Sequence, residues 1–343
     1  MNGLLRELCL INGVSGDETD VREFIIDKIK DKCEYRTDNL GNLICFKKGR
    51  KTPKNKLMIC AHMDEVGFIV TAVRSDGTLA FETVGGIDAS VVIGRQVTVK
   101  NYRTGKVYNG VVGSTAVHNL SKEQREKAPE ISGLYIDIGA ENKEDAEKYI
   151  DLGDCAYFVS DYESYGGNHI KSKALDDRAG CAMMVEMICG EIEYDTWFVF
   201  NVQEEVGLRG ARASAFSVAP DFAVVLESTT AADIDGAGGA KRVCEQGKGP
   251  VVSFMDRSTI YDKELYRLAF DIAKENGIPC QTKTMIAGGN DSGAIHISGK
   301  GVRTIAVSLP CRYLHSASSV IKSEDLDNSR RLVKILAERI AVL

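Results

Sequence analysis

Short, continuously apolar runs alternate with helical patterns along this chain, and they constrain its fold more than any other feature. The runs LMICA, WFVFNV, FAVVL and IAVSL have the length of strands and lack the polar alternation of a half-exposed strand. Strands that are apolar on both faces are typical of parallel sheets. The sequence therefore predicts an α/β fold, with a mostly parallel central sheet that has helices on both faces.

The expected elements follow from this alternation of strand and helix periods. The predicted strands are residues 42–46, 56–61, 196–202, 222–226 and 304–309. The predicted helices are residues 4–11, 17–32, 180–188, 263–276 and 323–342. We expect Gly277 to end one of these helices and Ser323 to cap the start of the last one.

Residues 67–165 differ in composition from the rest of the chain. They are rich in Val, Ile and Thr, and the turn signals SDG, Gly-Gly and RTGK follow at close intervals. This pattern predicts a small β-barrel or sandwich, with one charged helix at 142–150. Because the α/β pattern occurs on both sides, we interpret the segment as an insertion. A chain of 343 residues is long enough for a catalytic domain at 1–66 and 166–343 and an inserted β-rich domain at 67–165.

Composition excludes several classes of protein. The formal net charge is −6, with Lys and Arg scattered among acidic residues, so no binding of nucleic acid is expected. No window approaches the roughly eighteen apolar residues of a membrane helix, and the N-terminal region lacks the pattern of a signal peptide. The ten cysteines include no C-x-x-C pair, and several lie in apolar segments, so we expect a reduced, cytoplasmic protein.

Ionisable side chains follow the carboxyl ends of four predicted strands. In chain order these are His62 and Asp64, then Glu204 and Glu205, then Glu227, and finally His315. In open α/β sheets, ligands bind at the edge where the carboxyl ends of the strands meet. Two imidazoles with several carboxylates suit zinc or a neighbouring divalent transition metal. The sequence therefore predicts a metal site at this edge.

Each of these residues also has an ordinary explanation when it is taken alone. A Glu-Glu pair is usually a solvated turn, Glu227 is a common end-of-strand charge, and Asp176-Asp177 would cap a helix. A single histidine at a strand end is usually hydrogen-bonded at the surface. All these explanations would have to hold independently at one edge of the sheet, so a shared ligand explains the set better.

The spacing within two of the pairs suggests separate roles. Residues two apart in an extended segment point to the same side, so Asp64 can hydrogen-bond one nitrogen of His62 while the other binds metal. Glu204 and Glu205 are adjacent and diverge. One of them can anchor a metal while the other takes a proton from water, which suits a hydrolase.

Four motifs, in this order, resemble the M42 family of metallo-aminopeptidases, which belongs to the co-catalytic dizinc exopeptidases and includes glutamyl and leucyl aminopeptidases. The motifs are HMDEVG at 62–67, KALDDRAG at 173–180, QEEVGLRGA at 203–211 and RYLHS at 312–316, supported by SGDE at 15–18, DNLGNLI at 38–44 and GGNDSG at 288–293. Order and approximate spacing match over nearly the whole chain. The inserted segment lies where the family has its dimerisation domain.

The resemblance implies two divalent metal ions, with zinc expected and cobalt or manganese also possible. It assigns Asp176 as the bridge between them, His62 and Glu227 to one metal, and Glu205 and His315 to the other. It also implies that Glu204 is the general base and that Asp64 orients His62. Position 227 departs from the family, in which many members have Asp. Asp176-Asp177 is where relatives have a cis peptide bond.

The expected function is that of a dimetal aminopeptidase, which removes N-terminal residues from peptides by means of a metal-bridged water and Glu204 as base. The resemblance further implies dimers and a tetrahedral homo-oligomer. One alternative is an amidohydrolase that deacylates small N-acyl substrates at the same site. Others are the endoglucanase activity for which some relatives are named and a non-catalytic assembly protein. Glycosidases use paired carboxylates rather than a metal cluster with histidine ligands, which argues against endoglucanase activity.

The substrate pocket is less defined by the sequence. Gly288, Gly289, Asn290 and Asp291 either shape the pocket for the first side chain or form a Gly-rich turn. Arg312 either faces a substrate carboxylate or braces Glu205. The sequence leaves the preferred N-terminal residue open.

Overall fold

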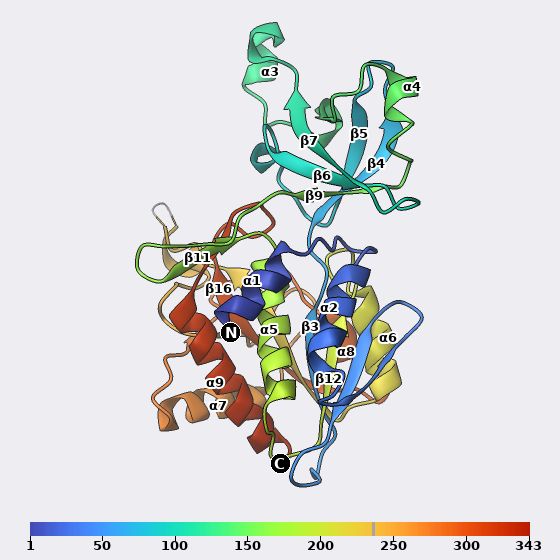
Figure 1. Cartoon of the computed structure of the whole chain (residues 1–343). Helices are drawn as coiled ribbons and strands as arrows, with labels where there is room; N and C mark the ends of the chain where they lie inside the picture. Colours follow the sequence, from blue (N-terminus) through green and yellow to red (C-terminus); the bar gives the residue numbers. More distant parts are fainter. Residues whose placement is uncertain (235–236) are drawn as a thin grey trace.

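Eight strands form one mixed sheet in the computed structural model, which describes residues 1–234 and 237–343 (Figure 1). The strand order is β1 (Glu34–Thr37), β2 (Leu43–Lys47), β12 (Thr196–Asn201), β3 (Leu57–His62), β13 (Phe222–Thr230), β16 (Arg303–Cys311), β14 (Val251–Val252) and β15 (Gln281–Thr282). The four central strands, from β12 to β16, run parallel to one another. Pairs nearer the edges, such as β2 with β12 and β14 with β16, are antiparallel. The predicted α/β fold is confirmed.

Two layers of helices cover this sheet, because its central strands are apolar on both faces. Leu57 and Ile59 of β3 pack with α1 (Asn2–Leu10), α2 (Thr19–Ile29), α5 (Leu175–Cys189), α7 (Lys263–Glu275) and α9 (Ser323–Ile340). Met58 and Cys60, which alternate with them, pack on the other face with α6 (Arg209–Val218) and α8 (Ser292–Ile295). The strand ends therefore emerge between two buried layers.

Several expected boundaries differ from the observed ones. The strand predicted at 222–226 continues to Thr230, because it pairs with β16 as far as Cys311, and Glu227 lies within it. The charged helix expected at 142–150 is only the short α4 (Lys143–Ala146). The prediction that Ser323 caps the last helix is wrong, since Lys322 holds that position. Gly277 does follow α7, with a left-handed φ of 59°.

Six strands between Gly67 and Phe158 close into a separate barrel, which Figure 1 shows set apart from the α/β body. Their order is β4 (Gly67–Val73), β5 (Leu79–Val84), β8 (Leu134–Asp137), β7 (Val107–Ser114), β6 (Gln96–Lys100) and β9 (Cys155–Phe158), with the short helix α3 (Lys122–Arg125) in a connection. Phe68 packs edge-on against Phe81 and Phe158, with ring centroids 5.0 Å apart in both pairs. The expected β-rich segment is therefore a closed barrel with its own apolar core.

A small sheet joins the barrel to the α/β body. It contains β10 (Glu163–Tyr165), β11 (His169–Ser172) and β17 (Ser319–Lys322), all antiparallel. The chain passes from β11 directly into α5, and β17 leads into α9. This sheet therefore connects the segment that follows the barrel to α5 and α9 of the α/β body.

Within the described ranges, no helix combines the length and the apolar character needed to cross a bilayer. All ten cysteines are free thiols, and Cys9, Cys45, Cys60, Cys181 and Cys311 are buried in apolar surroundings. Such thiols act as small apolar side chains in the core.

Candidate metal centre

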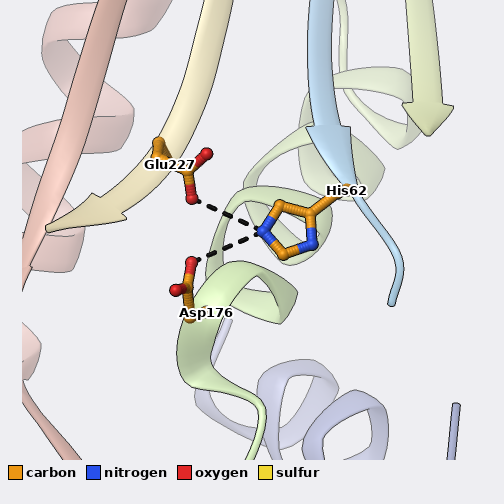
Figure 2. Close-up of side chains that lie close together, drawn as sticks. All are labelled: His62, Asp176 and Glu227. Carbon is orange, nitrogen blue, oxygen red and sulfur yellow. Dashed lines mark ion pairs between the residues drawn. The ribbon is translucent and has the colours of Figure 1, made fainter. Parts of the chain in front are cut away.

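The first group of ionisable side chains surrounds His62, the last residue of β3. Its Nε2 atom lies 3.5 Å from Asp176 Oδ1 and 3.5 Å from Glu227 Oε1. Figure 2 shows the two carboxylates, from the start of α5 and from β13, facing the same ring nitrogen. The His62 side chain is buried. Two strands and one helix therefore bring one imidazole and two carboxylates together.

The second group shares Asp176 with the first. His315 Nε2 lies 3.6 Å from Asp176 Oδ2 and 3.3 Å from Glu205 Oε2. The two oxygens of Asp176 therefore face two different histidines. Asp176 and Asp177 have non-helical backbone angles at the start of α5, and the peptide bond between them is cis. The Asp177 carboxylate accepts a hydrogen bond from Gly180 N at 3.0 Å, which satisfies a free amide of the helix that follows.

Asp64 contacts His62 and the Glu204–Glu205 pair at the same time. His62 Nδ1 lies 3.4 Å from Asp64 Oδ1 and 3.1 Å from the main-chain oxygen of Asp64. The carboxylate also accepts hydrogen bonds from the main-chain N–H groups of Glu204 and Glu205, at 3.0 and 3.1 Å, and from Ser15 Oγ at 2.6 Å. Asp64 thus holds the backbone of both glutamates and also contacts the Nδ1 atom of the His62 imidazole.

Glu18, which was named in the sequence analysis only as part of the SGDE motif, supports the same turn. Its Oε1 atom accepts hydrogen bonds from Gln203 N at 3.0 Å and from Gly16 N at 2.9 Å. Gln203 has a left-handed φ of 54°, so its backbone needs such support. Burial, together with the charge of Asp64, raises the pKa of Glu18 to about 7.

Burial and the neighbouring charges shift the pKa values of the ionisable groups in this cluster. Burial raises the pKa of Glu205 to about 7 and places that of Glu204 well above its ordinary range. Burial alone would lower the pKa of His315, but the hydrogen bond with Asp176 and the charge of Glu205 outweigh it and raise the value to about 9. Burial would raise the pKa of Asp176, but the two histidines lower it. Such mutually perturbed groups in a cleft are typical of functional sites.

The donor set fits divalent cations. Potential ligand atoms of His62, Asp176 and Glu227 lie within 4.8 Å of one another, as do those of Asp176, Glu205 and His315. Asp176 Oδ1 is buried without a hydrogen-bond partner among the described residues. Nitrogen and carboxylate ligands at such separations are those that zinc and its neighbours use. A buried carboxylate needs compensation, and a cation beside each histidine would supply it.

A cavity of about 420 Å³ opens onto this centre. Apart from the ionisable groups described above, its wall contains polar β13 residues, apolar side chains, two glycines and two lysines. Among them are Thr229, Val243, Met285, Leu314, Lys241, Lys283, Gly288 and Gly289. A volume of this size suits one side chain and part of a peptide.

The predicted pocket residues separate into two sets. Gly288 and Gly289 line the cavity, whereas Asn290 and Asp291 are buried and do not line it. Asn290 hydrogen-bonds Tyr261, and Asp291 accepts a bond from Asn201 at 2.7 Å. Neither residue is part of the cavity wall, and the expectation that they shape the pocket for the first side chain stays a prediction.

Arg312 also has a different partner from either of the two expected. Its guanidinium donates hydrogen bonds of 2.6 and 2.8 Å to Asp233. The two lysines of the cavity wall were missed, because each lies outside the predicted strands and helices and matches no motif.

The comparisons with known proteins agree with this geometry. The family model for M42 glutamyl aminopeptidases matches residues 41–332. The chain belongs to the M42 family of aminopeptidases. This M42 protein is 41% identical to a protein of Acetivibrio thermocellus, over 99% of this chain and 98% of the other. It is 32% identical to the lysyl aminopeptidase of Pyrococcus furiosus, over 98% and 96% of the two chains.

A solved structure shares the whole fold of this M42 protein. The TET1 peptidase of Pyrococcus horikoshii superposes with a TM-score of 0.86 and is 34% identical, covering 98% of each chain. That peptidase can assemble into a tetrahedron or a large octahedral shell. The agreement covers both the sheet and the barrel. The M42 chain is therefore a peptidase of the exopeptidase class, as its sequence motifs predict.

Proposed function

We propose that this M42 aminopeptidase holds two divalent cations and that Glu204 is its general base. The position of Asp176 carries the proposal, since one of its oxygens faces His62 and the other faces His315. His62 and Glu227 would hold one cation, and Glu205 and His315 the other. Zinc is the expected metal, and cobalt and manganese suit the same donors. When bound, the cations would polarise water and the scissile carbonyl.

Glu204 and Glu205 would have separate roles at this centre. Glu205 lies 3.3 Å from His315, whereas Glu204 forms no ion pair with the described residues. A carboxylate oxygen of Glu204 lies within 4.8 Å of ligand atoms of His62 and Glu205, so it is close enough to take a proton from a water held at the cluster. Both its backbone N–H and that of Glu205 are anchored on Asp64. Glu204 would accept the proton of the attacking water and deliver it to the departing amine.

The cleavage position follows from the same acidic surroundings. In its neutral form a free α-amino group can bind one of the proposed cations and donate hydrogen bonds to the carboxylates of the cluster. Peptides would therefore bind with the amino terminus at the metal centre, which restricts cleavage to the first residue. An N-acylated substrate lacks this free amine, which argues against the deacylase alternative.

We also propose that the chain forms dimers through residues 67–165 and assembles further into a closed homo-oligomer. The likeness over the full length to a peptidase that forms tetrahedra supports this. The barrel has exposed apolar residues such as Val111 and Val117, which are 50% and 67% exposed in the monomer. A self-complementary contact there would remove them from water.

Metal analysis of the purified protein, with peptidase assays before and after chelation, tests the proposal. We expect two metal equivalents per chain and removal of single N-terminal residues that stops on chelation and returns when zinc, cobalt or manganese is added. Peptides with an acetylated amino terminus should resist. Faster hydrolysis of N-acyl amino acids than of free peptides would favour the deacylase instead.

A further inference from the structure

The loop between α1 and α2 contains the SGDE motif, and it contacts both the barrel and the metal centre. Residues 12–18 of this loop form the connector segment. Figure 1 shows this stretch on the side of the α/β body that faces the barrel. The proposed function gives no role to the contacts that it makes with the barrel.

On the barrel side, the connector segment is held through Asp17. Its carboxylate accepts hydrogen bonds from Lys100 Nζ, in β6, at 3.3 and 3.5 Å, and from the hydroxyl group of Tyr157, in β9. Tyr157 is buried, and the side chain of Asp17 is only 13% exposed. Hydrogen bonds to a carboxylate that is shielded from water are stronger than those of an exposed ion pair. Two strands of the barrel therefore fix the position of Asp17.

On the other side, two residues of the connector segment hold the metal centre. Ser15 Oγ donates a hydrogen bond to Asp64 at 2.6 Å, and Glu18 accepts one from Gln203 N at 3.0 Å. Asp64 in turn accepts from the next two amides of the turn at 203–205. All three amides of this turn therefore depend on the connector segment, one of them directly and two of them through Asp64.

The backbone between these contacts forms a tight turn. Asp17 N donates a hydrogen bond to Val14 O at 2.8 Å, and Gly16 has a φ of 96°, in the region that favours glycine. Val14 also packs on the first residue of the barrel, because a Cβ atom at Gly67 would lie 2.2 Å from Val14 Cγ2. A displacement of Asp17 is therefore passed to the residues on both sides of it.

We propose that Asp17 is a positioning residue of the reaction, because its anchoring on the barrel fixes the connector segment and thereby the orientation of Glu204. This inference rests on the proposed role of Glu204 as general base. A contact that only joined the barrel to the α/β body would affect folding. A positioning contact affects kcat, because a general base must lie within hydrogen-bond reach of the water that it deprotonates.

Steady-state kinetics of the metal-loaded enzyme test this role on whichever amino-acid p-nitroanilide it cleaves best. Asp17→Ala should lower kcat by about tenfold, with KM within about twofold of the wild type and an unchanged metal content. Asp17→Asn keeps an acceptor for Tyr157 and should lose less. Asp20→Asn is the matched control, since Asp20 also pairs with Lys100, at 2.9 Å, but is 58% exposed and lies in α2, outside the connector segment. Its kcat should stay within about twofold of the wild type.

Tyr157→Phe removes a single hydroxyl group and tests whether the barrel acts through Asp17. This variant should lower kcat by about threefold. Its combination with Asp17→Ala should be no slower than Asp17→Ala alone, because both changes break the same link. A wild-type kcat in both single variants, or losses that multiply in the double variant, would overturn the inference.

Hydrogen exchange followed by mass spectrometry tests the same link without catalysis. The amides at 203–205 are hydrogen-bonded to the carboxylates of Glu18 and Asp64, so their exchange reports how firmly the turn is held. In Asp17→Ala this segment should exchange about tenfold faster, and Tyr157→Phe should show a smaller change of the same kind, while α9 keeps its wild-type protection.

The two levels of the proposal fail separately. If no free amino terminus is cleaved, the proposed function fails, and exchange at 203–205 still decides about the connector segment. Wild-type protection of this segment in Asp17→Ala would overturn the positioning role. Equally faster exchange over the whole chain in both variants would show a loss of global stability alone and would overturn it as well.

Discussion

At the scale of single residues, the centre depends on carboxylates that hold backbone as well as on those that face the histidines. Asp64 accepts from two consecutive amides, and Glu18 accepts from the amide just before them. The orientation of Glu204 and Glu205 is therefore set by hydrogen bonds from two other segments. Such supporting contacts keep reacting groups within the narrow geometry that catalysis requires.

Glu204→Gln separates metal binding from proton transfer. The amide keeps the shape of the side chain but cannot accept the proton, so kcat should fall by roughly two to four orders of magnitude. The metal content should remain that of the wild type. Glu205→Gln is the comparison, because it faces His315 and should lose metal as well as activity. Wild-type turnover in the Glu204 variant would show that another group is the base.

Glu18→Ala tests the bracing of the turn. The change leaves the amides of Gln203 and Gly16 without their acceptor, and we expect a loss of about 1–3 kcal/mol in the free energy of unfolding, with a lower kcat. Glu18→Gln keeps an acceptor oxygen and should lose less of both. Denaturant unfolding and steady-state kinetics measure these effects, with Glu23→Gln on the exposed side of α2 as control. Unchanged stability in the alanine variant would contradict this role.

The residues that converge at the centre were predictable because each follows a strand of the same apolar pattern. The carboxyl ends of parallel strands meet at one edge, so His62, Glu204 and Glu227 had to lie near one another. The lysines of the cavity wall were not predictable, since they lie between predicted strands and helices, where no periodicity fixes a direction. The contact of Glu18 with Gln203 was also not predictable, because an acidic residue at the start of a helix is usually explained by its favourable interaction with the helix dipole.

At the scale of elements, the sequence defined the central strands well and the edges of the sheet poorly. Runs such as LMICA predict a central strand, because an apolar strand must be buried on both of its faces. The strands β14 and β15, at one side of the sheet, have two residues each and carry no comparable signal. The start of α5 could not be located either, since Asp176 and Asp177 take non-helical angles that depend on their surroundings.

Arg178, just after this irregular start, connects three elements. Its guanidinium donates to Met63 O at 2.7 Å, after β3, and to Leu8 O at 2.6 Å, in α1. The side chain is fully buried, and removing one partner of such a network is costly. We expect Arg178→Met to lower the free energy of unfolding by roughly 3–5 kcal/mol, as measured by urea titration. Arg331→Met on the exposed surface of α9 should change it by less than about 0.5 kcal/mol.

At the scale of the whole molecule, bound cations should stabilise the folded chain. The ligand atoms come from segments between residues 62 and 315, and they assemble only in the folded state. Cation at a hundred times its dissociation constant would stabilise by about 2.7 kcal/mol per site. Chelation should therefore lower the melting temperature by several degrees, and added zinc should restore it. An unchanged melting temperature after verified loss of metal would argue that the cluster is not the binding site.

The barrel is not an independent appendage of the α/β body. The chain between β5 and β6 returns to the centre, where the carbonyl oxygen of Gly86 lies 2.7 Å from His315 Nδ1. That bond selects which ring nitrogen is left to face Asp176 and Glu205. Excision of the insertion, or its exchange for a foreign barrel, would thus remove this contact of the His315 imidazole. A variant that removes the insertion to prevent assembly would therefore also change the surroundings of His315 in the cleft.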